Sequence, residues 1–263
     1  MPARHASALE VSLKTGLIVG TGLDGIAEGV PWVEATTPYG YTVTATIPFG
    51  GTEVMIVRRH GPALNIPPHL VNYRANLWAM RDAGVRRVLA TAAVGSLRKE
   101  IQPLTLSLVR DFIDFSKHRR LTIYDRPSER LIHTDLSKPY CPLLNSVLEH
   151  AAMETGVELG RRVVYVCVDG PRYETPAEVR MFAKWGGDVV GMTSAPEAAL
   201  SKELDICYAS LAIVTNYAAG FVDHPLHHAD VAACAVQLQP KVRAILEKAV
   251  ALIPEMGNGH SVD

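Results

Sequence analysis

Four side chains in the second half of the chain are of the types that hold a flat heterocycle beside an anion. They are Tyr173, Glu174, Thr193 and Asn216. An aromatic ring stacks on a heterocycle, and a carboxylate and a carboxamide hydrogen-bond to its polar edge. A threonine hydroxyl can donate a hydrogen bond to an anion. This combination predicts a site for a purine base next to phosphate.

Each of these side chains lies in a run that follows an apolar stretch. The runs begin at Gly170, Gly191 and Val214. Ligands of open α/β sheets bind outside the carboxyl ends of the strands. We therefore expect the three runs to meet at one edge of a sheet.

Two further motifs predict an anion site at the same edge. Gly20-Thr21-Gly22 follows an apolar run and can direct amide hydrogens and a hydroxyl at one phosphate. Arg59-His60 ends another such run, and arginine is the best bidentate donor to phosphate. Gly20–Gly25 also fits Gly-x-Gly-x-x-Gly, but residues 26–38 hold two prolines and no helical stripe. A dinucleotide site is therefore not favoured.

Apolar and amphipathic segments alternate along the chain. This predicts one α/β domain over residues 1–263, with a central mixed, mainly parallel sheet flanked by helices. Strands are expected at 13–19, 41–47, 53–58, 85–94, 104–115, 163–168, 188–192 and 208–215. Helices are expected at 69–83, 142–154, 176–185, 196–204 and 230–252. Residues 1–12 and 255–263 are expected to be flexible tails, and 116–139 an excursion from the core.

The 41–47 and 53–58 strands are expected to form an antiparallel hairpin. Alternation in the first of them places Tyr41, Val43, Ala45 and Ile47 on one face and three threonines on the other.

Composition argues against several kinds of partner. The 263 residues are 48% hydrophobic and 20% charged, with a formal net charge of −1. This balance predicts neither nucleic acid nor an acidic membrane surface as a partner. No apolar run approaches the roughly 20 residues that a membrane-spanning helix needs. We expect a cytoplasmic protein, with the basic cluster of Lys117, Arg119 and Arg120 in a solvated loop.

The cysteines and histidines do not indicate a metal site. The cysteines at 141, 167, 207 and 234 form no Cys-x-x-Cys pair, so we expect free thiols in a reducing compartment. Asp223 and the histidines at 224, 227 and 228 lack a second cluster at ligand spacing. No metal and no cofactor are expected.

The chain resembles the family of trimeric purine nucleoside phosphorylases and methylthioadenosine (methylthioinosine) phosphorylases. The resemblance covers nearly its whole length. It is carried by Gly20-Thr21-Gly22, Arg59-His60-Gly61, the runs at 67–76 and 93–97, and the three runs that begin at 170, 191 and 214.

The resemblance implies a role for each matching residue. It assigns phosphate binding to Thr21, Arg59, His60, the backbone amide of Ala93, and Thr193. It assigns purine and ribose binding to Tyr173, Glu174, Gly191, Met192, Asn216 and His228. Asn216, Glu174 and His60 would be the catalytic residues. His133 would reach the 5′ pocket of a neighbouring subunit in a homotrimer or hexamer, and inorganic phosphate would be the co-substrate.

Some positions depart from the family pattern. Ala92 replaces a polar residue beside the phosphate, and Leu64 replaces a histidine. Asn216 and Ala218 replace two aspartates of the adenine-specific branch. A carboxylate with a carboxamide complements a 6-oxopurine, whereas adenine would leave mismatched buried polar groups at about 1–3 kcal/mol each. His228 suits a 5′-hydroxyl better than a thiomethyl group.

The expected activity is reversible phosphorolysis of inosine or guanosine to the free base and ribose 1-phosphate, in purine salvage. The alternative is a 5′-methylthioinosine or 5′-methylthioadenosine phosphorylase. A nucleosidase that uses water and an inactive purine-binding relative are alternatives from other classes.

Overall fold

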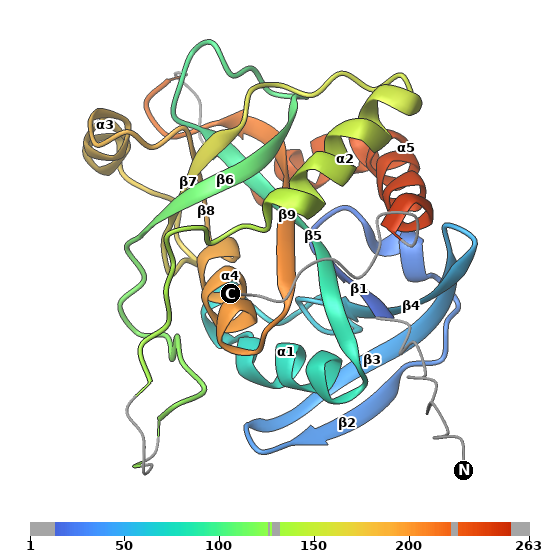
Figure 1. Ribbon diagram of the computed structural model, residues 1–263. Helices are drawn as coiled ribbons and strands as arrows, with labels where there is room; N and C mark the ends of the chain where they lie inside the picture. Colours follow the sequence, from blue (N-terminus) through green and yellow to red (C-terminus); the bar gives the residue numbers. More distant parts are fainter. Residues whose placement is uncertain (1–13, 126, 128–131, 222–225, 254–263) are drawn as a thin grey trace, which may run out of the picture.

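A mixed β-sheet forms the centre of the computed structural model, which describes residues 14–125, 127, 132–221 and 226–253 (Figure 1). Within these residues nine strands pair in the order β2-β3-β4-β1-β5-β8-β7-β6-β9. The strands are β1 (Lys14–Val19), β2 (Val33–Thr37), β3 (Gly40–Phe49), β4 (Thr52–Arg58), β5 (Val85–Ser96), β6 (Leu106–Asp114), β7 (Val163–Cys167), β8 (Val189–Gly191) and β9 (Cys207–Tyr217). Parallel pairs join β1 to β4 and β5, β5 to β9, and β7 to β6 and β8. The expected α/β fold with a mixed sheet flanked by helices is confirmed.

Half of the sheet closes on itself. Strand β5 pairs with both β8 and β9, so the pairings β5-β8-β7-β6-β9 return to β5. The long parallel pair of β5 and β9 runs from Arg87 and Cys207 to Ser96 and Tyr217. This pairing holds the carboxyl ends of both strands next to each other.

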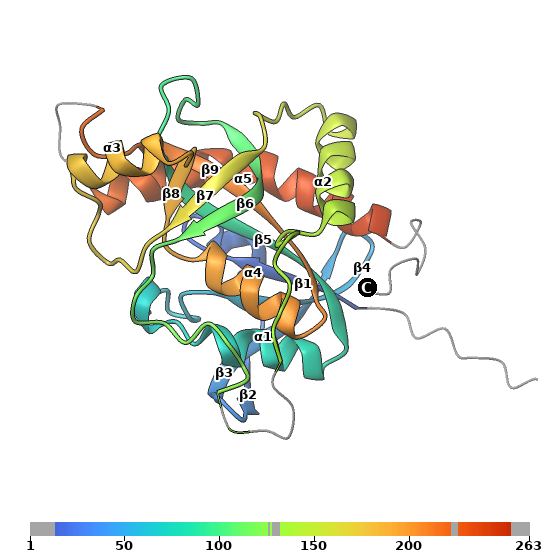
Figure 2. The ribbon, with the colours of Figure 1, turned by 60° about the vertical axis from the view of Figure 1, so that its left-hand side comes forward.

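Helices cover both faces of the sheet (Figures 1 and 2). They are α1 (Tyr73–Asp82), α2 (Pro142–Glu154), α3 (Pro176–Lys184), α4 (Ser194–Glu203) and α5 (His228–Leu252), with the short 3-10 helices η1 (Asp24–Ala27) and η2 (Pro68–Leu70). Helices α2 and α5 pack together on one apolar core, and α1 and α4 on the other. Helix α3 packs at the end of the sheet with β7 and β8.

Local sequence sets the helix starts that lie nearest the predicted site. Thr175 caps α3 in a capping box: its side chain accepts from the Glu178 amide, and Glu178 accepts from the Thr175 amide. Pro176 occupies the first turn, where a missing amide hydrogen costs nothing. The start of α3 is therefore fixed directly after Glu174.

The predicted hairpin is present, and its first strand alternates as expected: Ala45 and Ile47 are buried, and Thr46 is exposed. Strands β3 and β4 pair antiparallel. Tyr41 is 67% exposed, whereas Thr42 and Thr44 are buried. Helix α1 covers the threonine side, and the Thr42 hydroxyl donates to Asn76 Oδ1 at 2.5 Å. At the start of the strand, helix α1 rather than the main core therefore buries the threonine face.

The expectation of four free thiols is wrong for two cysteines. Cys141, which precedes α2, and Cys207, which begins β9, form a disulfide. Cys167 and Cys234 are free. Spacing gave no signal, because the two bonded positions are 66 residues apart and become neighbours only in the fold.

The other expected helices and strands are present, and most of their ends lie within a few residues of the predicted positions. The helix expected from 69 begins at Tyr73 after η2, and β2 was not predicted. Residues 116–139, where described, form neither helix nor strand. The predicted tails, residues 1–12 and 255–263, lie outside the described residues. No helix in the described part of the chain has the length and apolarity to span a membrane.

Packing between α2 and α5 predicts that alanine substitutions at two residues of α2 differ in their effect on the free energy of unfolding. Leu148 is fully buried in that core, and its replacement by alanine should lower the free energy of unfolding by about 2–5 kcal/mol. Met153, on the same helix, is 70% exposed, so Met153→Ala should change it by less than about 0.5 kcal/mol. Urea unfolding of both variants tests this, and equal changes would contradict the packing described.

Candidate active site

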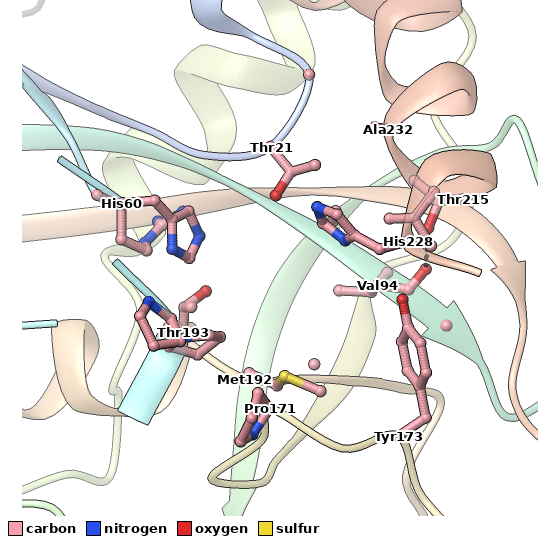
Figure 3. Close-up of a pocket in the computed structure, with 18 of the residues that line it drawn as sticks. Thr21, His60, Val94, Pro171, Tyr173, Met192, Thr193, Thr215, His228 and Ala232 are labelled. Atoms are coloured by element: carbon pink, nitrogen blue, oxygen red, sulfur yellow. Dashed lines mark hydrogen bonds between the residues drawn. The ribbon is translucent and has the colours of Figure 1, made fainter. Parts of the chain in front are cut away.

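One cavity of about 500 Å³ lies where the predicted site residues meet. The ends of β1, β4, β5, β7, β8 and β9 and the first turns of α5 supply its walls. The predicted residues that line it are Thr21, Arg59, His60, Ala93, Tyr173, Glu174, Gly191, Met192, Thr193, Asn216 and His228. Figure 3 shows His60 and Thr193 on one side and Tyr173 on the opposite side, with Met192 between them.

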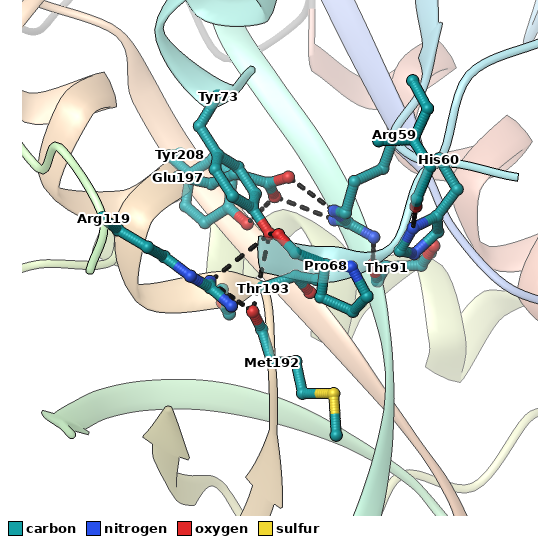
Figure 4. A network of polar contacts seen from close by, with 12 residues as sticks. Arg59, His60, Pro68, Tyr73, Thr91, Arg119, Met192, Thr193, Glu197 and Tyr208 are labelled. Carbon is teal, nitrogen blue, oxygen red and sulfur yellow. Dashed lines mark hydrogen bonds and ion pairs between the residues drawn. The ribbon is translucent and has the colours of Figure 1, made fainter. Parts of the chain in front are cut away.

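A buried ion pair fixes the arginine of the anion side. Arg59 Nε and Nη2 donate to the two carboxylate oxygens of Glu197 at 2.5 and 2.8 Å, and Nη1 donates to the Thr91 carbonyl at 2.8 Å (Figure 4). Both charged side chains are almost fully buried. Burial by itself lowers the pKa of Arg59, but the charge and hydrogen bonds of Glu197 outweigh it and raise that pKa. Tyr208 donates to the same carboxylate at 2.7 Å.

The pairing leaves Arg59 with donors for a ligand. A guanidinium has five N–H groups, and three are used here. Gly20 allows the close approach of Arg59 to the first strand, because a Cβ at that position would lie 2.5 Å from Nη1. The two remaining N–H groups belong to a side chain that is held rigidly at the cavity wall.

His60 is neutral and has a fixed tautomer. Its Nδ1 lies 2.8 Å from the Ile66 carbonyl, which can only accept, so Nδ1 carries a proton. Burial, and after it the charge of Arg59, lower the pKa of His60. Nε2 therefore faces a ligand as an acceptor unless an anion binds and stabilises the imidazolium form.

Thr193 precedes α4 without capping it. Its side chain makes no cap hydrogen bond, and its amide donates to the Tyr165 hydroxyl at 3.0 Å. Thr193 lines the cavity at a helix N-terminus, which favours negative charge. Thr21 and Ala93 also line the cavity.

The opposite end of the cavity carries groups suited to a heterocycle. Tyr173 is partly buried, and Glu174 is buried. Burial raises the pKa of Glu174. Asn216 Nδ2 donates to the Tyr217 carbonyl at 2.8 Å, and its Oδ1 accepts from the Thr215 hydroxyl at 2.8 Å. These two bonds fix the amide orientation and leave one N–H and one lone pair for a ligand.

The middle of the cavity lies between Met192 and His228, which face each other in Figure 3. Gly170 has a φ of +70°, and a Cβ there would collide with the Met192 side chain. This glycine therefore lets the loop after β7 close over the loop after β8. His228 begins α5 and contributes to the electrostatic environment of His60.

Three other positions that the sequence analysis singled out are His133, Ala92 and Leu64. His133 is exposed and does not line the cavity, so its predicted role at a neighbouring subunit stays a prediction. Ala92 is buried beside the lining residue Ala93. Leu64 lines the cavity and is partly exposed.

Comparison with known proteins identifies the family. The sequence profile of the phosphorylase superfamily matches residues 14–251. The chain belongs to the phosphorylase superfamily.

Several relatives of this phosphorylase match over almost the whole chain. A probable 6-oxopurine nucleoside phosphorylase of Dictyoglomus turgidum is 41% identical over 248 residues, covering 94% of each chain. A probable S-methyl-5′-thioinosine phosphorylase of Methanopyrus kandleri is 43% identical over 244 residues, covering 92% of this chain and 93% of its own. The structure of methylthioadenosine phosphorylase from Schistosoma mansoni with adenine superimposes with a TM-score of 0.87 at 30% identity, covering 92% of each chain. The stated family resemblance is confirmed.

Sequence reasoning gave no role at the site to four residues that support it. Glu197 and Tyr208 hold Arg59, and Thr215 orients Asn216. The side chain of Arg119 is 4% exposed and is not solvated as expected, whereas that of Arg120 is exposed. Only Glu197 had a usable signal, because a carboxylate within the apolar first turn of α4 needs a buried partner.

The buried carboxylate predicts a pH dependence of base binding. A 6-oxopurine bound as the family resemblance implies would donate its N1–H to the ionised form of Glu174, and that form is lost as the pH falls through the raised pKa. Hypoxanthine affinity should therefore begin to fall at a higher pH than an ordinary glutamate, with a pKa of about 4.3, would give. Calorimetric titration without phosphate from about pH 8 to pH 5 measures this.

Glu174→Gln is the control for that titration. It should bind hypoxanthine more weakly, with a flatter pH dependence. The same pH dependence in the variant and the wild type would assign the titration to another group.

Proposed function

We propose that this phosphorylase catalyses reversible phosphorolysis of 6-oxopurine nucleosides, inosine or guanosine, to the free base and ribose 1-phosphate in purine salvage. One observation carries the proposal: a single cavity is lined by a fixed arginine with unused donors, by an oriented carboxamide and by a buried carboxylate. The relatives with 6-oxopurine nucleoside phosphorylase names support it.

The base end favours 6-oxopurines. Glu174 accepts from N1–H, and the remaining Nδ2–H of Asn216 donates to N7 or O6. Adenine has an acceptor at N1, which would face the acceptor Glu174. The Thr215 and Tyr217 bonds to the amide oppose the flip that would accommodate an amino group. Such mismatches cost about 1–3 kcal/mol each.

The reaction transfers the ribosyl group from nitrogen to oxygen. The C1′–N9 bond breaks, and its electron pair leaves with the purine, which Asn216 stabilises through N7. A phosphate oxygen then bonds to C1′, and the proton lost from phosphate is taken up by the purine. Arg59, His60, Thr21, Thr193 and the Ala93 amide would hold phosphate, and its negative charge would stabilise the cationic sugar. The catalysis consists of positioning and electrostatics, without a metal or cofactor.

A second candidate is phosphorolysis of 5′-methylthioinosine. Apolar side chains of the first turns of α5 and of the loop after β4 line parts of the cavity: Val231, Ala232, Val236, Leu64 and Ile66. Such a wall suits a thiomethyl group, and the Methanopyrus kandleri relative bears that name. His228 offers a polar partner and favours a 5′-hydroxyl.

Further parts of the proposal concern assembly and location. We propose a homotrimer or hexamer in which His133 of one subunit approaches the 5′ pocket of the next, and a cytoplasmic enzyme without nucleic acid partners. The exposure of His133 is compatible with such a contact.

A phosphate-dependence assay tests the function. With excess phosphate, the enzyme should convert inosine and guanosine to base and ribose 1-phosphate, and adenosine at least about tenfold more slowly. Removing phosphate should stop the reaction. Equal turnover without phosphate would indicate a nucleosidase, binding without turnover an inactive relative, and faster reaction of methylthioinosine the second candidate.

Replacing Asn216 tests the role of the amide in the reaction. Asn216→Ala should lower kcat about 100-fold or more, since the donor to the departing purine is lost. Its KM for phosphate should change little, because the anion end is untouched. Steady-state kinetics with each substrate varied separates the two effects, and equal losses in both parameters would argue against the assigned role.

A further inference from the structure

Arg119 is buried although it lies in a segment without helix or strand. Its side chain is 4% exposed, whereas that of the next residue, Arg120, is 73% exposed. A buried cation requires partners that compensate for lost hydration. Those of Arg119 are almost all backbone carbonyls of the site loops.

The guanidinium of Arg119 joins two of these loops. Nη2 donates to the carbonyls of Val168 and Asp169, at 3.1 and 2.7 Å, and Nη1 donates to the carbonyl of Met192 (Figure 4). Nε lies 3.4 Å from Asp169 Oδ1. The first loop follows β7 and leads to the base-end residues, and the second follows β8 and carries the residues of the sugar and anion.

The same side chain supports a third wall of the cavity. Nη1 of Arg119 lies 3.4 Å from the Tyr73 hydroxyl, which donates to the Pro68 carbonyl at 3.0 Å. The guanidinium carbon is 5.3 Å from the centre of the Tyr73 ring. Pro68 lines the cavity. One cation therefore contacts three segments that are remote in sequence.

The planar guanidinium of Arg119 is suited to fixing the distance between the two loops that it contacts. A guanidinium is planar and rigid, so carbonyls bound to its two nitrogens keep a fixed separation. Lysine offers a single point charge and cannot reproduce that fork. A nucleoside spans both loops, and a displacement of about 1 Å between reacting groups can cost about 100-fold in rate.

We propose that Arg119 is a positioning residue that holds the base-binding loop after β7 at the separation from the loop after β8 that a nucleoside and phosphate require. This inference rests on the proposed phosphorolysis. Arg119 touches neither substrate and acts through the carbonyls of Val168, Asp169 and Met192.

Arg119→Ala should lower kcat about 100-fold, as expected for a displacement of about 1 Å between the halves of the site. The Kd for hypoxanthine alone and the KM for phosphate should change less than about threefold, because each loop keeps its own ligand groups. Arg119→Lys should recover only part of kcat. Arg120→Ala is the matched control and should behave as the wild type.

Guanidinium ion provides a readout that a purely structural role would not move. At millimolar, non-denaturing concentrations it should raise kcat of Arg119→Ala by occupying the vacated space, and should leave the wild type and Arg120→Ala unchanged. Methylammonium, which lacks the fork, should rescue less.

The inference is overturned if Arg119→Ala keeps kcat within about threefold of the wild type, even with a lower Tm, or if guanidinium gives no rescue. If the alanine variant does not fold, Arg119→Lys decides, and wild-type kcat in that variant overturns it. Failure of the proposed function would instead appear in the wild-type enzyme, as absence of phosphorolysis.

Discussion

The buried contact between Arg59 and Glu197 links the sheet to the site. Arg59 follows β4, Glu197 lies in α4, and the pair is completed by the Thr91 carbonyl of β5 and the Tyr208 hydroxyl of β9. Breaking a buried pair by removing one partner leaves an uncompensated charge, which is strongly destabilising. Strands β4, β5 and β9 and helix α4 are therefore joined around one buried ion pair. The arginine that faces the cavity is placed before any ligand arrives, so little reorganisation is needed on binding.

This pairing also shapes the electrostatics of the anion end. The charge of Glu197 offsets that of Arg59, so the pair offers an anion oriented donors with little net charge. The hydroxyl of Thr193, the N-terminus of α4 and the neutral His60 complete the set. A dianion at this position would favour protonation of His60, because a nearby opposite charge stabilises the imidazolium.

Sequence reasoning was strongest where one strand end supplies one side chain. The apolar runs ending near Thr21, Arg59 and Asn216 predicted both the strands and the shared edge, and all three residues line one cavity. It was weakest where a side chain acts across the fold. The Thr42 face depends on α1, the Cys141–Cys207 disulfide joins residues far apart in sequence, and Arg119 contacts carbonyls that carry no sequence signal. A local sequence pattern shows periodicity and turn-forming residues. The buried Thr42 face, the disulfide and the Arg119 contacts depend instead on which distant element packs against a segment.

Helix α5 is divided between two tasks. Its later turns, including Leu246, belong to the core with α2, while Val231, Ala232 and Val236 in its first turns line the cavity beside His228. Substitutions in those early turns alter the cavity wall beside His228 and leave the later packing untouched. The part of α5 that lines the cavity can therefore change during evolution without a change in the part that holds the scaffold together.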